Sequence, residues 1–193
     1  MSEPRVVESS VRSFVCVYER YEEAPFRLGT LVAVREGSAT VLGVVADIES
    51  GPEDPTRPLQ PRGNPGQSAS DVMADNPELR LLLRTAITIV SCGFVEDGAV
   101  RPALPPNPPP LLALVGEASI TEALQIGAEG AFLALLVHSP LCDDPVIAAA
   151  IRSVGSAYGA ETEAFNVIAG KELARLLRAD PSRLTNILRG VAG

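Results

Sequence analysis

The residues best suited to chemistry stand close together near the end of an apolar run. His138 is the only histidine of the chain, and Cys142, Asp143 and Asp144 follow it closely. Imidazole can act as a base near neutral pH and a thiolate as a nucleophile, so a Cys/His pair or a metal site is one hypothesis. The structural interpretation is stronger, because no second histidine or orienting motif is present. We expect His138 to make a structural hydrogen bond, the aspartates to begin a helix, and none of these residues to be catalytic.

Four acidic residues gather where a long loop is expected to begin: Asp47, Glu49, Glu53 and Asp54. Divalent cations such as Ca²⁺ need several oxygen ligands, which makes a metal site one interpretation, but the spacing of an EF-hand is missing. Solvated loop charge is the simpler interpretation. We therefore expect no bound metal.

A nucleotide site would need a glycine-rich loop followed by a lysine. Lys171 is the only lysine and it follows Gly170, but Phe165 stands where the first glycine of GxxxxGK[ST] would be. The stretch from Gly155 to Thr162 has its second glycine one position too early. We expect no cofactor.

Basic residues are the remaining candidates for recognition. From Lys171 onward the chain has five basic and two acidic residues, which could meet nucleic acid or an acidic partner. Basic side chains near a helix end are also what the helix dipole favours, and we prefer that explanation. The candidate interaction residues are Arg35, Arg101, Arg175, Arg178 and Arg183.

Composition excludes several classes of protein. The chain has 193 residues, 46% hydrophobic, with 24 acidic against 16 basic residues and a net charge of -8. This is too apolar for a disordered chain, and no run approaches a membrane span. The start lacks the pattern of a signal peptide, and three cysteines without a CxxC pair do not indicate a disulfide scaffold, so we expect a soluble cytoplasmic protein. The acidic charge and the 4% aromatic content disfavour nucleic acid as a partner.

The elements that position these residues divide the chain at about residue 118. Before it, β-branched or alternating runs predict six strands at 11–18, 30–35, 40–48, 86–95, 100–101 and 111–115. Residues 36–39 suit a hairpin link, and Gly93 suits a bulge. Asn76 and Pro77 suit the start of a helical turn. We expect an α+β fold in which a small, mostly antiparallel six-stranded barrel occupies residues 1–118 and a helical region occupies 119–193.

Prolines and helix signals complete the plan. Eleven of the 17 prolines fall in two short stretches, which predicts a long surface loop at 50–74 and a stiff strip at 101–110. In the second part, residues 132–137 are a buried strand or helix. Asp144-Pro145 and Asp180-Pro181 predict helix starts, and a helix between them ends near Arg178, although residues 164–169 could equally be a strand.

The order of these signals resembles the HAS barrel, the domain shared by HerA-type DNA-translocating ATPases and ATP synthase catalytic subunits. The resemblance covers about residues 1–118 and consists of Gly29 before a hydrophobic strand, the hairpin into Leu42–Val45, a strand ending at Gly93, and an acidic-glycine turn leading to the proline-rich stretch. HAS barrels often have Pro-Gly before the last strand, where this chain has Pro108-Pro109-Pro110. The ATPase core that follows such barrels is missing its phosphate loop here.

The resemblance implies protein assembly more than chemistry. HAS barrels in the ATPases form a collar on a ring and, in the DNA-translocating branch, help to dock a nuclease. We expect a non-enzymatic protein that self-associates or docks on a ring ATPase or nuclease, with the edges of strands 30–35 and 40–48 available for pairing. The alternatives are a nucleic-acid-binding barrel and a small enzyme centred on His138 and Cys142.

Overall fold

The computed structural model describes residues 3–21, 26–37, 39–54 and 56–192. Seven strands form one antiparallel sheet: β1 (Arg5–Ser9), β2 (Ser13–Val17), β3 (Leu31–Glu36), β4 (Ala39–Pro52), β5 (Leu83–Glu96), β6 (Ala99–Arg101) and β7 (Val115–Glu117). Six of them follow the order β1-β2-β5-β4-β3-β7, while β6 pairs with β5 alone. Ser38, in the predicted hairpin link, and Pro55, in the predicted loop, lie outside the described residues.

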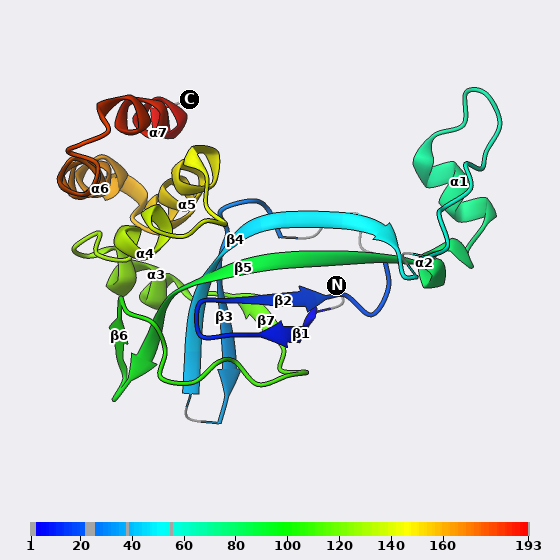
Figure 1. Cartoon of the computed structure of the whole chain (residues 1–193), viewed down its shortest axis with the longest axis horizontal. Coiled ribbons are helices and arrows are strands. Elements are labelled where there is room, and N and C mark those ends of the chain that lie inside the picture. The colour runs from blue at the N-terminus through cyan, green and yellow to red at the C-terminus, as the bar shows by residue number, and fades with distance from the viewer. Residues whose placement is uncertain (1–2, 22–25, 38, 55, 193) are drawn as a thin grey trace.

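The sheet curls until its two ends meet (Figure 1). The backbone amide of Val6 in β1 donates to the carbonyl of Ala113 at 3.0 Å, and the amide of Val115 donates to Pro4 at 2.9 Å. Arg5 lies opposite Leu114 in an isolated antiparallel bridge. The α+β prediction is confirmed: a curled antiparallel six-strand sheet is followed by helices.

Those helices are α3 (Ile120–Gly127), α4 (Leu133–Val137), α5 (Asp144–Ser156), α6 (Thr162–Leu176) and α7 (Pro181–Ala192). The alternative of a strand at 164–169 is wrong, because this stretch lies inside α6. The helix α5 begins one residue earlier than predicted: Asp143 is its N-cap, and its side chain accepts a hydrogen bond from the amide of Val146. Asp180 accepts one from the amide of Arg183, as expected of a cap.

The strand predictions need two further corrections. We did not predict β1, in which Val6 is the only buried residue. The last strand lies at Val115–Glu117 rather than 111–115, because Leu112 has a φ of 66° and interrupts the extended backbone. Gly93 does lie beside an irregularity, since the β4–β5 register shifts where Leu42 and Gly43 face Gly93 and Ser91.

The sheet buries side chains on both of its faces. The interior core lies inside the curl and contains Phe14, Val32 and Ile87 with their neighbours. The second core, which we call the covered side, lies between the outer face of β3, β4 and β5 and the helices, and Leu42 and Phe132 belong to it. Because the covered side includes residues from both the sheet and the helices, the two halves of the chain share one core.

Gly29 marks the closest approach of sheet and helices. It has a φ of 79°, and a Cβ atom there would lie 2.4 Å from the backbone carbon of Ala149 in α5. Its amide donates to Val45 at 2.8 Å. Close by, Ser153 of α5 accepts a hydrogen bond from the amide of Leu31. Only a glycine permits this backbone-to-helix contact.

The outer ends of β4 and β5 run out as an arm, defined here as residues 49–86 (Figure 1). Beyond the pair of Glu49 with Ala86, β5 pairs only with β4. The arm ends in α1 (Ala69–Asp75) and α2 (Leu79–Leu82). The predicted loop at 50–74 is therefore partly strand and partly helix, and Ser68 with Asp71 forms a capping box at α1. Asn76 ends α1, and the predicted helical turn does begin there, because its carbonyl accepts a hydrogen bond from the amide of Leu79 at 3.0 Å. The N-cap of α2 is Glu78 rather than Asn76.

Candidate interaction surface

His138 makes the structural hydrogen bond that we predicted. It ends α4, and its Nδ1 lies 2.7 Å from the carbonyl oxygen of Ala134, one turn earlier. Its side chain is exposed. Cys142 is buried, and burial raises the pKa of its thiol to about 11 despite a hydrogen bond from Ser139. At neutral pH this sulfur is a thiol, which is a poor nucleophile.

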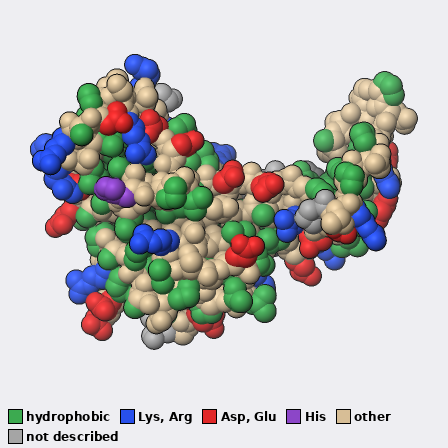
Figure 2. All heavy atoms as spheres, viewed as in Figure 1, with side chains coloured by type: hydrophobic (Ala, Val, Ile, Leu, Met, Phe, Trp, Pro, Cys, Tyr) green, Lys and Arg blue, Asp and Glu red, His purple; other side chains and the backbone are tan. Residues whose placement is uncertain are grey.

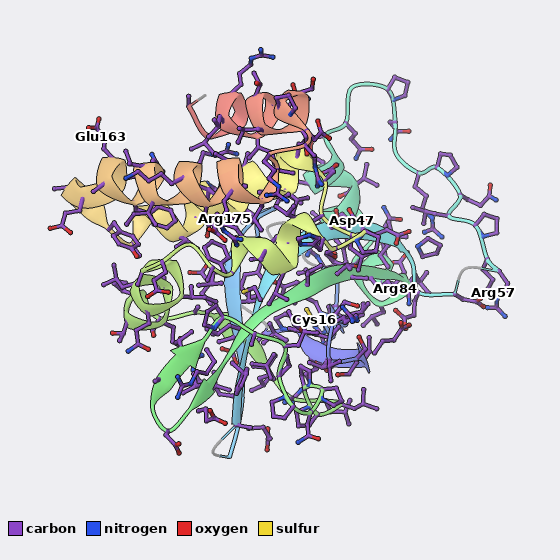
Figure 3. All side chains as sticks on the ribbon, turned by 60° about the vertical axis from the view of Figure 1, so that its left-hand side comes forward. Cys16, Asp47, Arg57, Arg84, Glu163 and Arg175 are labelled. Carbon is purple, nitrogen blue, oxygen red and sulfur yellow. The ribbon has the colours of Figure 1, made fainter. Side chains whose placement is uncertain are left out.

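The other two cysteines are also structural. Burial raises the pKa of Cys16, inside the curl, to about 12, and raises the pKa of Cys92 beneath the helices as well. All three cysteines are free and buried. Figure 3 shows Cys16 deep among the strands. Buried thiols of this kind behave as small apolar side chains.

The acidic residues near the arm do not converge. Asp47 and Glu49 lie on β4, and Asp54 accepts hydrogen bonds from the amide and the hydroxyl of Thr56, which lower the pKa of its carboxyl group. Among the described residues, no group of three or more His, Cys, Asp or Glu side chains is arranged to hold a metal ion. Arg57 pairs with Asp54 across 3.5 Å at the arm's outer loop.

Four of the five candidate arginines pair with acidic side chains of the chain itself. Arg35 on β3 pairs with Glu122, the residue that also completes the capping box of α3. Arg101 lies 3.5 Å from Glu96 across the β5–β6 turn. Arg175 contacts Glu172 on α6 at 2.6 Å, and this hydrogen bond raises the pKa of Arg175. No ion pair is recorded for Arg178 within the described residues.

Arg183 links three helices through hydrogen bonds. Its Nε donates to Asp144 at the start of α5 at 2.7 Å, and its other nitrogens donate to the carbonyls of Val137 and Cys142. This one side chain joins α7 to the end of α4 and the beginning of α5. The five arginines lie on different elements and do not form one site. Figure 3 shows Arg175 near the end of α6.

The two strands that we expected to offer free edges are internal. The strand β3 lies between β4 and β7, and the body part of β4 lies between β5 and β3. The predicted proline strip at 101–110 packs against the sheet. Pro105 and Pro109 are buried, and with Val34, Val41 and Phe94 the strip lines a cavity of about 310 Å³ at one end of the curl.

An uncovered apolar surface lies on the outside of β1, β2 and the segment that closes the curl. Val6, Cys16 and Ala113 point into the interior core, so the residues that alternate with them point outward. Among these, Val7 is 43% exposed, Leu112 66% and Leu114 41%. We call this surface the open face; its apolar members are Val7, Val15, Val17, Leu112 and Leu114.

Two rows of paired residues cross the open face from strand to strand. The first row runs from the closing segment across β1, β2 and β5 to β4, and consists of Leu114, Arg5, Val17, Ala86 and Glu49. The second row runs from β1 across β2 and β5 to β4, and consists of Glu8, Val15, Thr88 and Asp47. The rows show that an apolar centre is bordered by acidic side chains, with Glu8 on one side and Asp47 and Glu49 on the other. Arg5 is the one basic residue in these rows.

Leu112 is held in an unfavourable conformation in the closing segment of the open face, next to β1. A φ of 66° is rare for a large L-residue and costs of the order of 1–3 kcal/mol. Two hydrogen bonds hold it: its amide donates to Val6 at 2.7 Å, and its carbonyl accepts from Arg5 at 2.8 Å. The result is an exposed leucine on a constrained backbone.

The arm carries a second exposed apolar group. Leu81 and Leu82 on α2 are 64% and 53% exposed, between Arg80 and Arg84. Behind them, Leu59, Met73 and Leu79 help to line a groove of about 580 Å³. Figure 2 shows the arm standing clear of the body, with hydrophobic and charged side chains side by side where it turns upward. We call Leu81, Leu82 and Arg84 the arm tip.

The sequence contained signals for both surfaces that we did not use. The stretch RVVES before residue 11 could have been recognised as a strand, and Leu79–Leu83 is a run of leucines interrupted only by Arg80. The hydrogen bond between Leu112 and Val6 joins residues far apart in the chain, so no local sequence signal could have predicted it.

Comparison with known proteins does not identify a family. No model of a known protein family matches the chain, and no curated protein matches it. None of the described helices has the length and apolar character needed to cross a membrane.

Proposed function

We propose that this chain is a non-enzymatic assembly protein of the HAS-barrel type, which associates with itself or docks on a ring ATPase or nuclease in cytoplasmic DNA processing. The observation that carries the proposal is the open face. A group of apolar side chains this exposed is typical of a surface that another protein covers. Its acidic border makes protein a better partner than a phosphate backbone.

The contacts of the chemically suitable residues support a role without catalysis. His138 is hydrogen-bonded to its own helix, Cys142 is a buried thiol, and Arg183 ties three helices together. Each has a structural task that explains its presence. The hydrogen bonds to Val6 and Arg5 hold the backbone of Leu112, but its exposed side chain has no structural task among the described residues, and backbone strain tends to persist where function requires it.

Light scattering on the purified protein, together with affinity capture from the native cell, tests the proposal. The informative variant is Leu114→Glu, which places a charge on the open face, and the matched control is Val167→Glu on α6, where Val167 is 56% exposed. We expect a mass above that of the monomer, or capture of an identified ATPase or nuclease, which Leu114→Glu abolishes and Val167→Glu preserves. A strict monomer that captures neither, or equal behaviour of the two variants, would contradict it.

A further inference from the structure

The arm tip and the open face have complementary characters. The arm tip presents two exposed leucines next to Arg84, and residues 79–84 contain two arginines and no acidic residue. Glu78, which precedes α2, pairs with Arg62 at 2.9 Å. The open face presents exposed apolar side chains next to Glu8 and Asp47. Apolar surface would meet apolar surface and cationic side chains would meet carboxylates if one covered the other.

One molecule carries both surfaces on a continuous sheet face. The row that ends at Glu49 and Ala86 is followed along the arm by the pair of Gly51 with Arg84. Since side chains alternate along a strand, Arg84 lies on the same face of the β4–β5 ribbon as Ala86 and Glu49. Figure 3 shows Asp47 and Arg84 near the two strands that lead to the arm. The acidic, apolar part thus lies nearer the body and the cationic, apolar part farther out.

This arrangement is self-complementary under a two-fold axis. A second copy turned by the two-fold would place its arm tip on the first copy's open face, and the first copy's arm tip would lie on the second's in the same way. The arm, whose own apolar packing is limited to Met73, Leu79 and their neighbours, would then gain a further surface to pack on.

From these observations we infer that the occupant of the open face is the arm of a second copy of this chain. In this dimer Leu81 and Leu82 of one copy cover Leu112 and Leu114 of the other, and Arg84 lies against Glu8, which is on the neighbouring strand β1. The inference rests on the proposed function and names one partner for it.

Cross-linking between two single substitutions tests the inference directly. The three native cysteines are buried, so Leu82→Cys and Leu114→Cys each add one accessible thiol. We mix the two variants and treat them with a short bismaleimide under native conditions. We expect the mixture to give several-fold more covalent dimer than either variant alone. The matched control mixes Leu82→Cys with Val167→Cys, which should give no such increase.

A charge reversal provides a second measurement that does not depend on cysteine. Arg84→Glu should weaken association by about tenfold, which corresponds to about 1.4 kcal/mol. Adding Glu8→Arg to the same chain should restore part of the loss, because the reversed pair is again of opposite sign. An unchanged dissociation constant for Arg84→Glu would overturn the inference.

The outcomes separate the inference from the proposed function. If the wild type is oligomeric but the mixture of Leu82→Cys and Leu114→Cys gives no excess dimer, the arm is not the occupant and the assembly role stands. If the protein is a monomer that captures an ATPase or nuclease through the open face, the arm is again not the occupant and the assembly role again stands. A monomer that captures neither overturns both.

Discussion

The outer surface of the curled sheet has a covered side and an open face, which differ in what packs on them. On the covered side, Leu31, Leu42 and Val44 lie under the helices and are at most 5% exposed. On the open face, side chains of the same chemical kind remain between 41% and 66% exposed at Leu114, Val7 and Leu112. Apolar side chains on the outside of this sheet are buried where the chain supplies a covering layer, and within the described residues it supplies that layer for one side only.

The largest difference should be found in the free energy of unfolding when a large side chain is removed from each side. Phe165 in α6 is fully buried, and its ring stacks on Tyr158 with centroids 4.7 Å apart. Phe165→Ala should lower the free energy of unfolding by about 3–5 kcal/mol. Leu114→Ala on the open face should change it by no more than about 0.5 kcal/mol. Urea denaturation of the monomer measures both, and equal losses would remove the distinction.

A second variant disrupts the contact between the sheet and α5 at Gly29, where the two approach most closely. Gly29→Ala introduces a Cβ against the backbone of α5 at a positive φ, and should cost about 3 kcal/mol. Gly37→Ala is the matched control: its φ is 58°, but nothing lies within 4 Å of a Cβ there, so only strain of about 1 kcal/mol applies. Thermal and urea unfolding should rank the variants in this order. A loss at Gly37→Ala as large as that at Gly29→Ala would mean that the contact with the helices is unimportant.

A smaller effect should appear in alkaline solution, because both cores contain buried thiols. The folded-state pKa of Cys142 is raised from 9.0 to about 11, and that of Cys16 to about 12. The folded state therefore holds these protons where the unfolded state releases them, and stability present below pH 9 falls as the pH rises toward 11. Unfolding free energies at a series of pH values measure the slope. Cys142→Ala should make the slope shallower, and an unchanged slope would show that this thiol does not contribute.

The covered side could largely be predicted from the sequence, because its signals are local. The β-branched run at 30–35 located β3, and the Asp180-Pro181 pair located the start of α7. Even there α3 was not predicted, although Ser119 and Glu122 form a recognisable capping box.

The open face could not be predicted in the same way, because its geometry comes from contacts between distant residues. The strand β1 has a single buried residue, and its closing partner is more than 100 positions away. The arm was hidden for another reason: Gly51 and Pro52 suggested a loop, whereas pairing with Arg84 and Leu83 keeps them in β4. Tertiary pairing outweighed local preference at both places.

The most direct test of the open face as a contact surface is the substitution Leu112→Gly, with stability and association measured on the same sample. Glycine relieves the backbone strain at φ 66° and removes the exposed side chain. We predict that the free energy of unfolding stays the same or rises by up to about 1 kcal/mol, while the association seen by light scattering or partner capture is lost. Unchanged association in a Leu112→Gly protein that is at least as stable as the wild type would contradict the account.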